Sequence, residues 1–323
     1  MSSFWHETIS FGSLKVPRVM AAPLDGITDS PLRQLIRRYS KTELLFTEMR
    51  HIACVANSRV PTLFAYENCE QPLAYQISAN NTRWLAEAVE AIVKHNFVML
   101  NLNMGCPAPQ VIRSGSGSAL MNNIPLYKEI VTELQKALNG RIPFTLKIRA
   151  GFKKSNAVEI AQIAQDLGVE GLVIHPRLQT GGFTAPLDYE IVAAVKKAVT
   201  MPVIFSGNIN NYGRMVKVHE RTGVDGFMIG RALWGCPWKM HEIMEEAAGR
   251  TFTIPIAEMV RIARIHLDLN IALYGPRGVN PFKKQLPQYI RGVDGASQLR
   301  SHLVRLQTAE EMAAALDNIL ISC

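Results

Sequence analysis

The sequence lacks the long apolar runs of membrane proteins and secreted precursors. No apolar run reaches the ~18–20 residues that span a bilayer. The first residues, MSSFWHETISFGSLKVP, contain no basic end followed by an apolar block and a small-residue cleavage site, so we expect no secretory signal. These absences argue against a membrane partner and favour a cytoplasmic protein.

Cysteine is scarce, and its spacing excludes two kinds of small scaffold. The five cysteines are odd in number and widely separated: Cys54, Cys69, Cys106, Cys236 and Cys323. No two of them form C-x-x-C, so neither a disulfide framework nor a zinc ribbon is indicated. The pair His51 and Cys54 is isolated, and we expect no metal site.

Several catalytic motifs are also missing. There is no Walker A motif and no G-x-S-x-G elbow. His241-Glu242 lacks the second histidine of H-E-x-x-H. The glycine-rich SGSGS at 114–118 lacks both a preceding strand and the third glycine of a dinucleotide fingerprint.

The composition is that of a globular protein. The 323 residues are 48% hydrophobic and 19% charged, with a mean hydropathy of +0.05. That content excludes a disordered chain, whose low hydrophobicity could not offset ordering entropy. At roughly 100–200 residues per domain, the length allows one large domain with a smaller partner.

Short β-prone apolar runs alternate with longer amphipathic segments. The eight runs are 18–23, 43–48, 72–77, 98–103, 143–148, 171–175, 202–205 and 225–230. Strands that alternate with helices predict a parallel sheet. Eight such units in about 230 residues favour an α/β fold of the (β/α)8 TIM barrel type, which typically takes ~250 residues. An open doubly wound sheet is the alternative.

After Trp238 the strand pattern stops and the chain reads as helical. Thr308 and Glu311 form a capping box before MAAALDNIL. The segment from Arg261 to Arg305 contains eight basic and two acidic residues, so it carries six of the eight net positive charges of the chain. We therefore predict a barrel domain over 1–245 and an all-helical domain over 246–323. The cluster is either a solvated surface or a site for a polyanion.

Polar and glycine residues follow nearly every predicted strand, where barrel enzymes carry their chemistry. They are Pro23, Leu24, Asp25, Gly26, Thr47, Glu48, Gln76, Asn101, Asn103, Gly105, Cys106, Pro107, Lys147, Arg149, His175, Arg177, Ser206, Gly207, Asn208, Gly230 and Arg231. A purely structural barrel has little reason to gather such groups on one rim. Those after the seventh and eighth strands lie where barrel enzymes commonly hold a phosphate.

Three side chains on this rim suggest chemistry. Lys147 would point into the barrel mouth, either as a Schiff-base nucleophile or to balance a cofactor's negative charge. His175, beside it, favours ligand contact. Cys106 lies in N-M-G-C-P before SGSGS, which predicts an exposed, movable loop. A thiol with a pKa near ~8.5 is mostly protonated at neutral pH and can donate a proton to a developing carbanion.

The motifs together resemble the tRNA-dihydrouridine synthase family. The resemblance is carried by AAPLDGITDSPLR, LLFTEM, NLNMGCPAPQVIRSGSGSALM, LKIRAGF, VIHPR, SGNI and MIGRALWGCPW, and by the tail LPQYIRGVDGASQLRSHL. It covers the chain from about residue 18 to the end. N-M-G-C-P followed by G-S-G-S-A-L is its most specific part.

The resemblance implies an FMN-bearing barrel, NADPH as electron donor, and reduction of the uracil C5–C6 bond in tRNA. Cys106 is then the general acid that protonates C5. Residues that match the family's cofactor site are Pro23, Leu24, Asp25, Gln76, Lys147, His175, Ser206, Gly207, Asn208, Gly230 and Arg231. Asn103, Arg149 and Arg177 are expected to face the target uridine or nearby RNA. The uridine must leave its stack to enter the mouth, and the basic helices would hold the RNA.

Some positions depart from the family pattern. Pro109 and Gln110 replace basic residues after G-C-P, Pro176 stands where the family has glycine, and Ser206 replaces an asparagine. Gln285 replaces a histidine of the tail motif. These departures put some RNA and flavin contacts in doubt, but they leave Cys106 and Lys147 in place.

Two other functions stay open at this point. One is a flavin-dependent barrel oxidoreductase that acts on a free pyrimidine or a small enoyl compound. The other is an RNA-binding protein that has lost turnover. The sequence leans toward the B-type bacterial branch and leaves undetermined the uridine position, the choice between transfer and ribosomal RNA, and NADPH against NADH. It also leaves the role of residues 1–17 open, and we expect a monomer.

Overall fold

Eight parallel strands form a barrel in the computed structural model, which describes residues 2–182 and 184–322. The strands are β3 (Val19–Ala21), β4 (Leu45–Phe46), β6 (Leu73–Ser78), β7 (Met99–Met104), β8 (Phe144–Gly151), β9 (Gly171–Leu178), β10 (Val203–Phe205) and β11 (Gly226–Ile229). Each pairs with its neighbours in the order β3, β11, β10, β9, β8, β7, β6, β4. The Ala21 amide donates to the Leu44 carbonyl at 3.0 Å and closes the circle. The predicted (β/α)8 barrel is confirmed.

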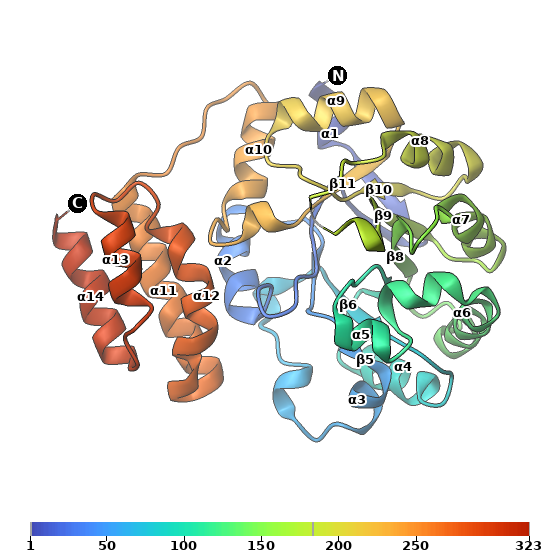
Figure 1. The fold of residues 1–323 in the computed structure, drawn as a ribbon, viewed down its shortest axis with the longest axis horizontal. Helices are drawn as coiled ribbons and strands as arrows, with labels where there is room; N and C mark the ends of the chain where they lie inside the picture. Colours follow the sequence, from blue (N-terminus) through green and yellow to red (C-terminus); the bar gives the residue numbers. More distant parts are fainter. Residues whose placement is uncertain (1, 183, 323) are drawn as a thin grey trace.

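Helices surround the strands (Figure 1). The outer ring contains α2 (Ser30–Tyr39), α3 (Ile52–Asn57), α4 (Leu85–Lys94), α6 (Ile124–Leu138), α7 (Ala157–Asp166), α8 (Tyr189–Ala198), α9 (Tyr212–Thr222) and α10 (Lys239–Ala247). The short β5 (Arg50–His51) and α5 (Pro109–Arg113) lie in the connections. Among the described residues, no helix has the length and apolar character that crossing a membrane requires.

Local sequence signals set several helix ends. The Asp29 carboxylate accepts from the Leu32 amide at 3.2 Å and so caps the N-terminus of α2. Thr308 and Glu311 exchange the two hydrogen bonds of a capping box at the start of α14 (Ala309–Ser322). The predicted capping box is confirmed.

An N-terminal hairpin closes the bottom of the barrel. The strands β1 (Thr8–Phe11) and β2 (Leu14–Pro17) follow α1 (Ser2–His6) and pair in antiparallel register. Their inward side chains belong to a hydrophobic cluster with residues from seven barrel strands: Ile9, Phe11 and Val16 pack with Met20, Phe46, Ala74, Met99, Val173, Ile204 and Met228. Residues 1–17, whose role the sequence left open, therefore supply an inner layer of the core.

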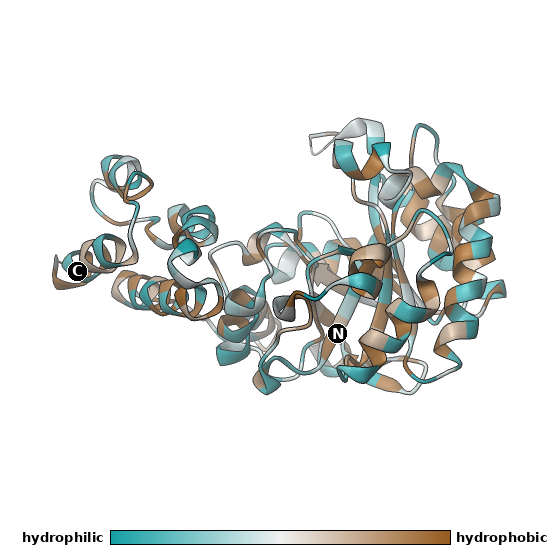
Figure 2. Cartoon of the chain, turned by 90° about the horizontal axis from the view of Figure 1, so that it is seen from below, coloured by the Kyte–Doolittle hydropathy of each residue, from teal (hydrophilic) through white to brown (hydrophobic). Residues whose placement is uncertain are grey.

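The C-terminal helices form a lobe beside the barrel (Figures 1 and 2). The lobe contains α11 (Ile256–Tyr274), α12 (Val279–Tyr289), α13 (Ala296–Leu303) and α14. Most of its apolar side chains gather in a hydrophobic cluster separate from that of the barrel, and α11 packs against α2. Figure 2 shows polar and apolar residues alternating along these helices, as amphipathic packing requires.

Gln285 joins this lobe to the barrel. Its side-chain amide donates to the Ile27 carbonyl at 2.9 Å, and its oxygen accepts from the Gly235 amide at 3.1 Å. The Trp234 indole donates to the Lys284 carbonyl at 2.7 Å. Because Ile27 lies in the loop after β3, the lobe is fastened to a loop that also borders the barrel mouth.

Candidate active site

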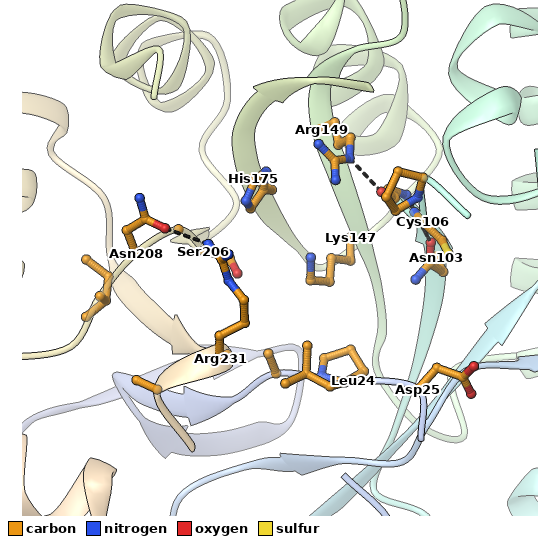
Figure 3. A pocket seen from close by; sticks show the side chains of 18 of the residues that line it. Leu24, Asp25, Asn103, Cys106, Lys147, Arg149, His175, Ser206, Asn208 and Arg231 are labelled. Atoms are coloured by element: carbon orange, nitrogen blue, oxygen red, sulfur yellow. Dashed lines mark hydrogen bonds between the residues drawn. The ribbon is translucent and has the colours of Figure 1, made fainter. Parts of the chain in front are cut away.

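A cavity of about 670 Å³ opens at the carboxyl ends of the barrel strands. Fourteen of the fifteen predicted site residues line it: Pro23, Leu24, Asp25, Gln76, Asn103, Cys106, Lys147, Arg149, His175, Ser206, Gly207, Asn208, Gly230 and Arg231. Figure 3 shows Asn208 and Arg231 at one side, Cys106 and Asn103 at the other, and Lys147 and His175 between them. The strand-end prediction therefore located one shared cavity.

One end of the cavity is built to receive an anion. Arg231 donates to the Asn208 side-chain oxygen at 2.8 Å, which fixes both beside the glycines that follow β10 and β11. A Cβ on Gly207 would lie 3.3 Å from Leu187 and 3.4 Å from Pro176, so a larger residue would fit tightly here and would cover the backbone that glycine leaves bare. A bare backbone beside a guanidinium is a typical phosphate cradle.

Arg214, from the first turn of α9, adds a second cation to this end. It lines the cavity beside Asn210 and donates to the Tyr189 hydroxyl at 3.4 Å. Its buried Nε has no hydrogen-bond partner among the described residues. The sequence analysis missed Arg214 because it considered strand ends, and this arginine lies on a helix.

Lys147 and His175 occupy the middle of the cavity. Burial, followed by the charge of Arg149, lowers the pKa of Lys147 to about 8. Burial and the nearby cations, Lys147 first among them, hold the pKa of His175 far below its usual range, so the ring is neutral. The buried Nδ1 of His175 has no partner among the described residues. A desolvated cation and an unpaired ring nitrogen both favour an anionic, hydrogen-bonding ligand here.

A chain of side-chain amides fixes the loop that carries Cys106. The Asn103 oxygen accepts from the backbone amides of Gly105 at 3.0 Å and Cys106 at 2.8 Å. Asn103 donates to Gln76 at 2.9 Å, and Gln76 donates to Asn101 at 2.8 Å. Asn101 then donates to the Thr145 hydroxyl at 2.9 Å. Because each amide has one donor end and one acceptor end, the chain sets the orientation of both Gln76 and Asn103.

Cys106 is half-buried at the cavity wall with its thiol protonated at neutral pH. Burial is the main cause that raises its pKa, opposed by a backbone hydrogen bond and by the charges of Lys147 and Arg149. Arg149 holds the same loop by donating from Nε to the Gly105 carbonyl at 2.7 Å. A thiol that keeps its proton can act as an acid and is a poor nucleophile.

The glycine-rich segment after Cys106 packs beneath it. Ser116 and Ser118 are buried, and Ser118 donates from its hydroxyl to the Cys106 carbonyl at 2.8 Å. Gly117 has φ +61°, and a Cβ there would lie 3.2 Å from Cβ of Cys106. The expectation of an exposed loop is therefore wrong for residues 116–118, whereas Ser114 and Gly115 are exposed as expected.

A charged cluster borders the mouth near the helical lobe. Glu48 accepts from the Gly26 amide at 2.6 Å and from Arg50 at 2.9 Å, and Arg50 also lies 3.4 Å from Asp25. Gly26 has φ +69°, and a Cβ there would approach Nζ of Lys284 to 2.7 Å. Thus a lysine of α12 lies at the loop that borders the cavity.

Arg177 is the predicted site residue that does not line the cavity. Its side chain is buried, and Nε donates to the Ala185 carbonyl at 2.6 Å. The lining residues that the sequence analysis did not place in the site are Ala22, Met49, Ile209, Asn210, Arg214 and Ala232. The described residues contain no cluster of side chains suited to a metal ion.

Comparisons with known proteins agree on one family. The family model described as "Dihydrouridine synthase (Dus)" matches residues 20–322. The tRNA-dihydrouridine synthase B of Pseudomonas aeruginosa is 33% identical over 319 residues, which cover 95% of this chain and 94% of that protein. The Escherichia coli protein of the same name is 32% identical, over 93% of this chain and 95% of its own. A probable tRNA-dihydrouridine synthase 1 from Synechocystis sp. is 30% identical, and the match covers 98% of this chain and 91% of that protein.

Solved structures share the fold at low sequence identity. Histamine dehydrogenase from Rhizobium sp. 4-9 superposes with a TM-score of 0.62 at 12% identity, over 83% of this chain and 51% of that one. Morphinone reductase superposes with a TM-score of 0.56 at 13% identity, and the match covers 77% of this chain and 90% of that one. These likenesses support the barrel architecture.

Proposed function

Because the chain belongs to the dihydrouridine synthase family, we propose that it reduces the C5–C6 bond of uridine in tRNA with FMN and NADPH. The observation that carries this proposal is that Cys106, Lys147 and the anion-binding end beside Arg231 line one cavity. The relatives are named for this activity, and they match this chain over nearly its whole length. The reaction needs an acid, a charge-stabilising group and a phosphate anchor, and these side chains supply one of each.

The cavity has one region suited to the phosphate of FMN and another suited to its ring system. Arg231, Asn208, Gly207 and Gly230 would hold the phosphate, with Arg214 as a further cation. Nδ1 of His175, which has no partner among the described residues, would form a hydrogen bond with the ligand. Lys147 would lie beside the ring system, where its desolvated charge favours a reduced, anionic form.

The protein's own part in the reaction is proton delivery and positioning. The chemistry supplied by bound FMN is hydride transfer, with NADPH as the source of the electrons. Cys106 would donate its proton to C5 of the uracil, and the resulting thiolate would recover a proton from solvent. Asn103 and Arg149 hold the backbone on either side of this thiol, so the acid stays aimed at the cavity.

We propose that the helical lobe, over 246–323, binds the RNA. Six of its basic residues make no ion pair with the described residues: Arg277, Lys283, Lys284, Arg291, Arg300 and Arg305. Arg261 and Arg264 are instead paired with acids on the lobe's own helices. Unpaired cations attract phosphates and give affinity that falls with salt. The enzyme would then act as a cytoplasmic monomer on tRNA.

The decisive experiment compares the Cys106→Ala variant with Cys54→Ala, which changes an exposed cysteine outside the cavity. We expect Cys106→Ala to bind FMN and to be reduced by NADPH normally, but to reduce tRNA about 10²–10⁴-fold more slowly, the usual contribution of a general acid. Cys54→Ala should match the wild type. The assay is anaerobic flavin absorbance followed by dihydrouridine mapping in the tRNA.

The other outcomes separate the alternatives. A protein that cannot be loaded with FMN contradicts the proposal, and tRNA from a deletion strain with unchanged dihydrouridine contradicts the substrate. Reduction of free uracil or a small enone at the same rate without RNA would favour a small-molecule oxidoreductase. If Cys106→Ala changes no activity, the protein is an RNA binder without turnover.

A further inference from the structure

A second pocket lies beside the cavity, in the groove between α8 and α9. It has a volume of about 490 Å³ and is lined by Tyr189, Asn211, Gly213, Arg214, Lys217, Val218 and Arg221. None of these residues except Arg214 lines the main cavity. The two hollows therefore meet at one arginine.

The pocket carries an excess of positive charge. Neither Arg214 nor Lys217 makes an ion pair with the described residues. Arg221 is paired with Glu190 at 2.9 Å, but that carboxylate is 77% exposed and its attraction is screened by water. The Arg221 guanidinium is held over the Tyr189 ring at 4.6 Å. Three cations converge on a concave surface where one exposed acid compensates them.

Arg214 shows which kind of ligand would complete this arrangement. Its Nε is buried and has no hydrogen-bond partner among the described residues, and the bond that its guanidinium donates to the Tyr189 hydroxyl is long at 3.4 Å. A buried guanidinium nitrogen without an acceptor is costly. An acceptor in either hollow would satisfy it, so the arginine can bridge two anions.

We propose that this second pocket binds the 2′-phosphate of the nicotinamide dinucleotide and so selects NADPH over NADH. The inference rests on the proposed function, which requires such a donor at the adjoining cavity. A 2′-phosphate carries nearly two charges, which suits several cations, whereas each phosphate of an RNA backbone carries one. The pocket also lies on barrel helices separated from the basic lobe by α10 and α2 (Figure 1).

The test uses Lys217, because this lysine lines the second pocket and does not line the main cavity. Lys217→Gln and Lys217→Glu form a graded series, and Lys197→Gln removes an exposed lysine from α8 outside the pocket as the matched control. Titration calorimetry with adenosine 2′,5′-bisphosphate should give a Kd about tenfold higher for Lys217→Gln, the usual effect of losing a charge-assisted bond. Lys217→Glu should weaken binding further. Adenosine 5′-diphosphate, which lacks the 2′-phosphate, should bind all variants equally.

Flavin reduction provides the second readout. In anaerobic stopped flow, Lys217→Gln should raise the NADPH concentration for half-maximal rate about tenfold while the limiting rate and the NADH values stay unchanged. Equal effects on NADPH and NADH, or no effect on either, would overturn the proposal. So would a loss of tRNA affinity with normal NADPH kinetics, which would assign the pocket to RNA. A wild-type protein that neither nucleotide can reduce would instead refute the proposed function.

Discussion

At the residue scale, Lys147 is a cation that the protein keeps away from water. Desolvation, and then Arg149, lowers its pKa to about 8 from the ordinary 10.5. No carboxylate is among the groups that act on it. A buried charge in this position is stabilised as soon as an anion enters the cavity. Ligand binding and proton binding at Lys147 are therefore linked.

We predict that FMN binding takes up a proton on Lys147 above pH 8. The anion raises the lysine's pKa, so flavin affinity should be constant below about pH 8 and fall above it, by at most about tenfold per pH unit. Calorimetry at pH 8.5 in two buffers of different ionisation enthalpy measures the uptake directly. The phosphate's own pKa, about 6, lies too low to interfere.

Lys147→Gln should abolish this uptake and flatten the pH profile, with weaker binding at pH 7. Lys153→Gln, an exposed lysine outside the cavity, should behave like the wild type. Proton uptake that persists in Lys147→Gln would show that another group is responsible.

The sequence located most site residues because parallel strands bring their carboxyl ends to one edge. That rule was enough to place Cys106, Lys147 and Arg231 in one cavity. It does not describe helix termini, so it missed Arg214. It also does not say where a long side chain turns after its strand ends: Arg177 donates to the Ala185 carbonyl and lies 3.5 Å from Nε2 of His175, without lining the cavity itself. Such choices depend on partners distant in sequence.

At the element scale, the N-terminus of α2 is an acidic cap buried between the barrel and the lobe. Asp29 accepts from Leu32 and also from the Tyr274 hydroxyl of α11, at 3.3 Å. Burial, and then the charge of Glu48, raises its pKa from 3.8 to about 6. The folded protein therefore holds a proton on Asp29 that the unfolded chain releases, and stability falls as the pH rises from about 4 to about 6.

We predict that Asp29→Asn removes this pH dependence, because asparagine is an equally good cap and has no charge to bury. The free energy of unfolding of the variant relative to the wild type should grow between pH 4 and pH 7, by at most about 3 kcal/mol. Urea denaturation at several pH values measures it. Asp188→Asn changes the exposed cap of α8 in the same way, and it should not reproduce the rise.

Elements with strong patterns were predictable, whereas those defined by long-range packing were not. All eight barrel strands overlap the predicted runs. β6 and β7 extend one residue beyond them, and β8 and β9 extend three residues beyond them, to Gly151 and Leu178. The N-terminal hairpin was missed because its strands are only four residues each. Its Gly12-Ser13 turn, with Gly12 at φ +53°, was the available signal.

At the scale of the whole molecule, Gln285 connects the lobe to the active-site loop. It is 2% exposed and satisfies one backbone group on each side of the junction, at Ile27 and Gly235. Removal of both bonds would leave the buried Gly235 amide and the partly buried Ile27 carbonyl unpaired, and an unpaired buried group costs roughly 1–3 kcal/mol. Gln285 thus acts together with the Trp234–Lys284 and Tyr274–Asp29 hydrogen bonds in holding the lobe beside the mouth.

We predict that Gln285→Leu separates RNA handling from flavin chemistry. FMN binding and reduction by NADPH should be unchanged, while the KM for tRNA rises about tenfold, because a loosened lobe loses about one such hydrogen-bonded contact. Limited proteolysis should cut faster in the segment 248–255 between the two parts. Gln298→Leu, an exposed change on α13, is the control, and equal effects of both variants would contradict the prediction.

The hairpin at the bottom of the barrel bears on how this enzyme should be compared with its relatives. The match to the family model starts at residue 20, after the strands that supply Ile9, Phe11 and Val16 to the interior, although the match to the Synechocystis relative covers 98% of the chain and extends into the hairpin. A chain trimmed to the segment that the family model matches would lack the hairpin, and the side chains of Met20 and Met228, which pack in the same cluster as the hairpin, would become exposed to solvent. Any measurement on such a shortened protein would describe a barrel whose core is incompletely packed, and not the intact enzyme.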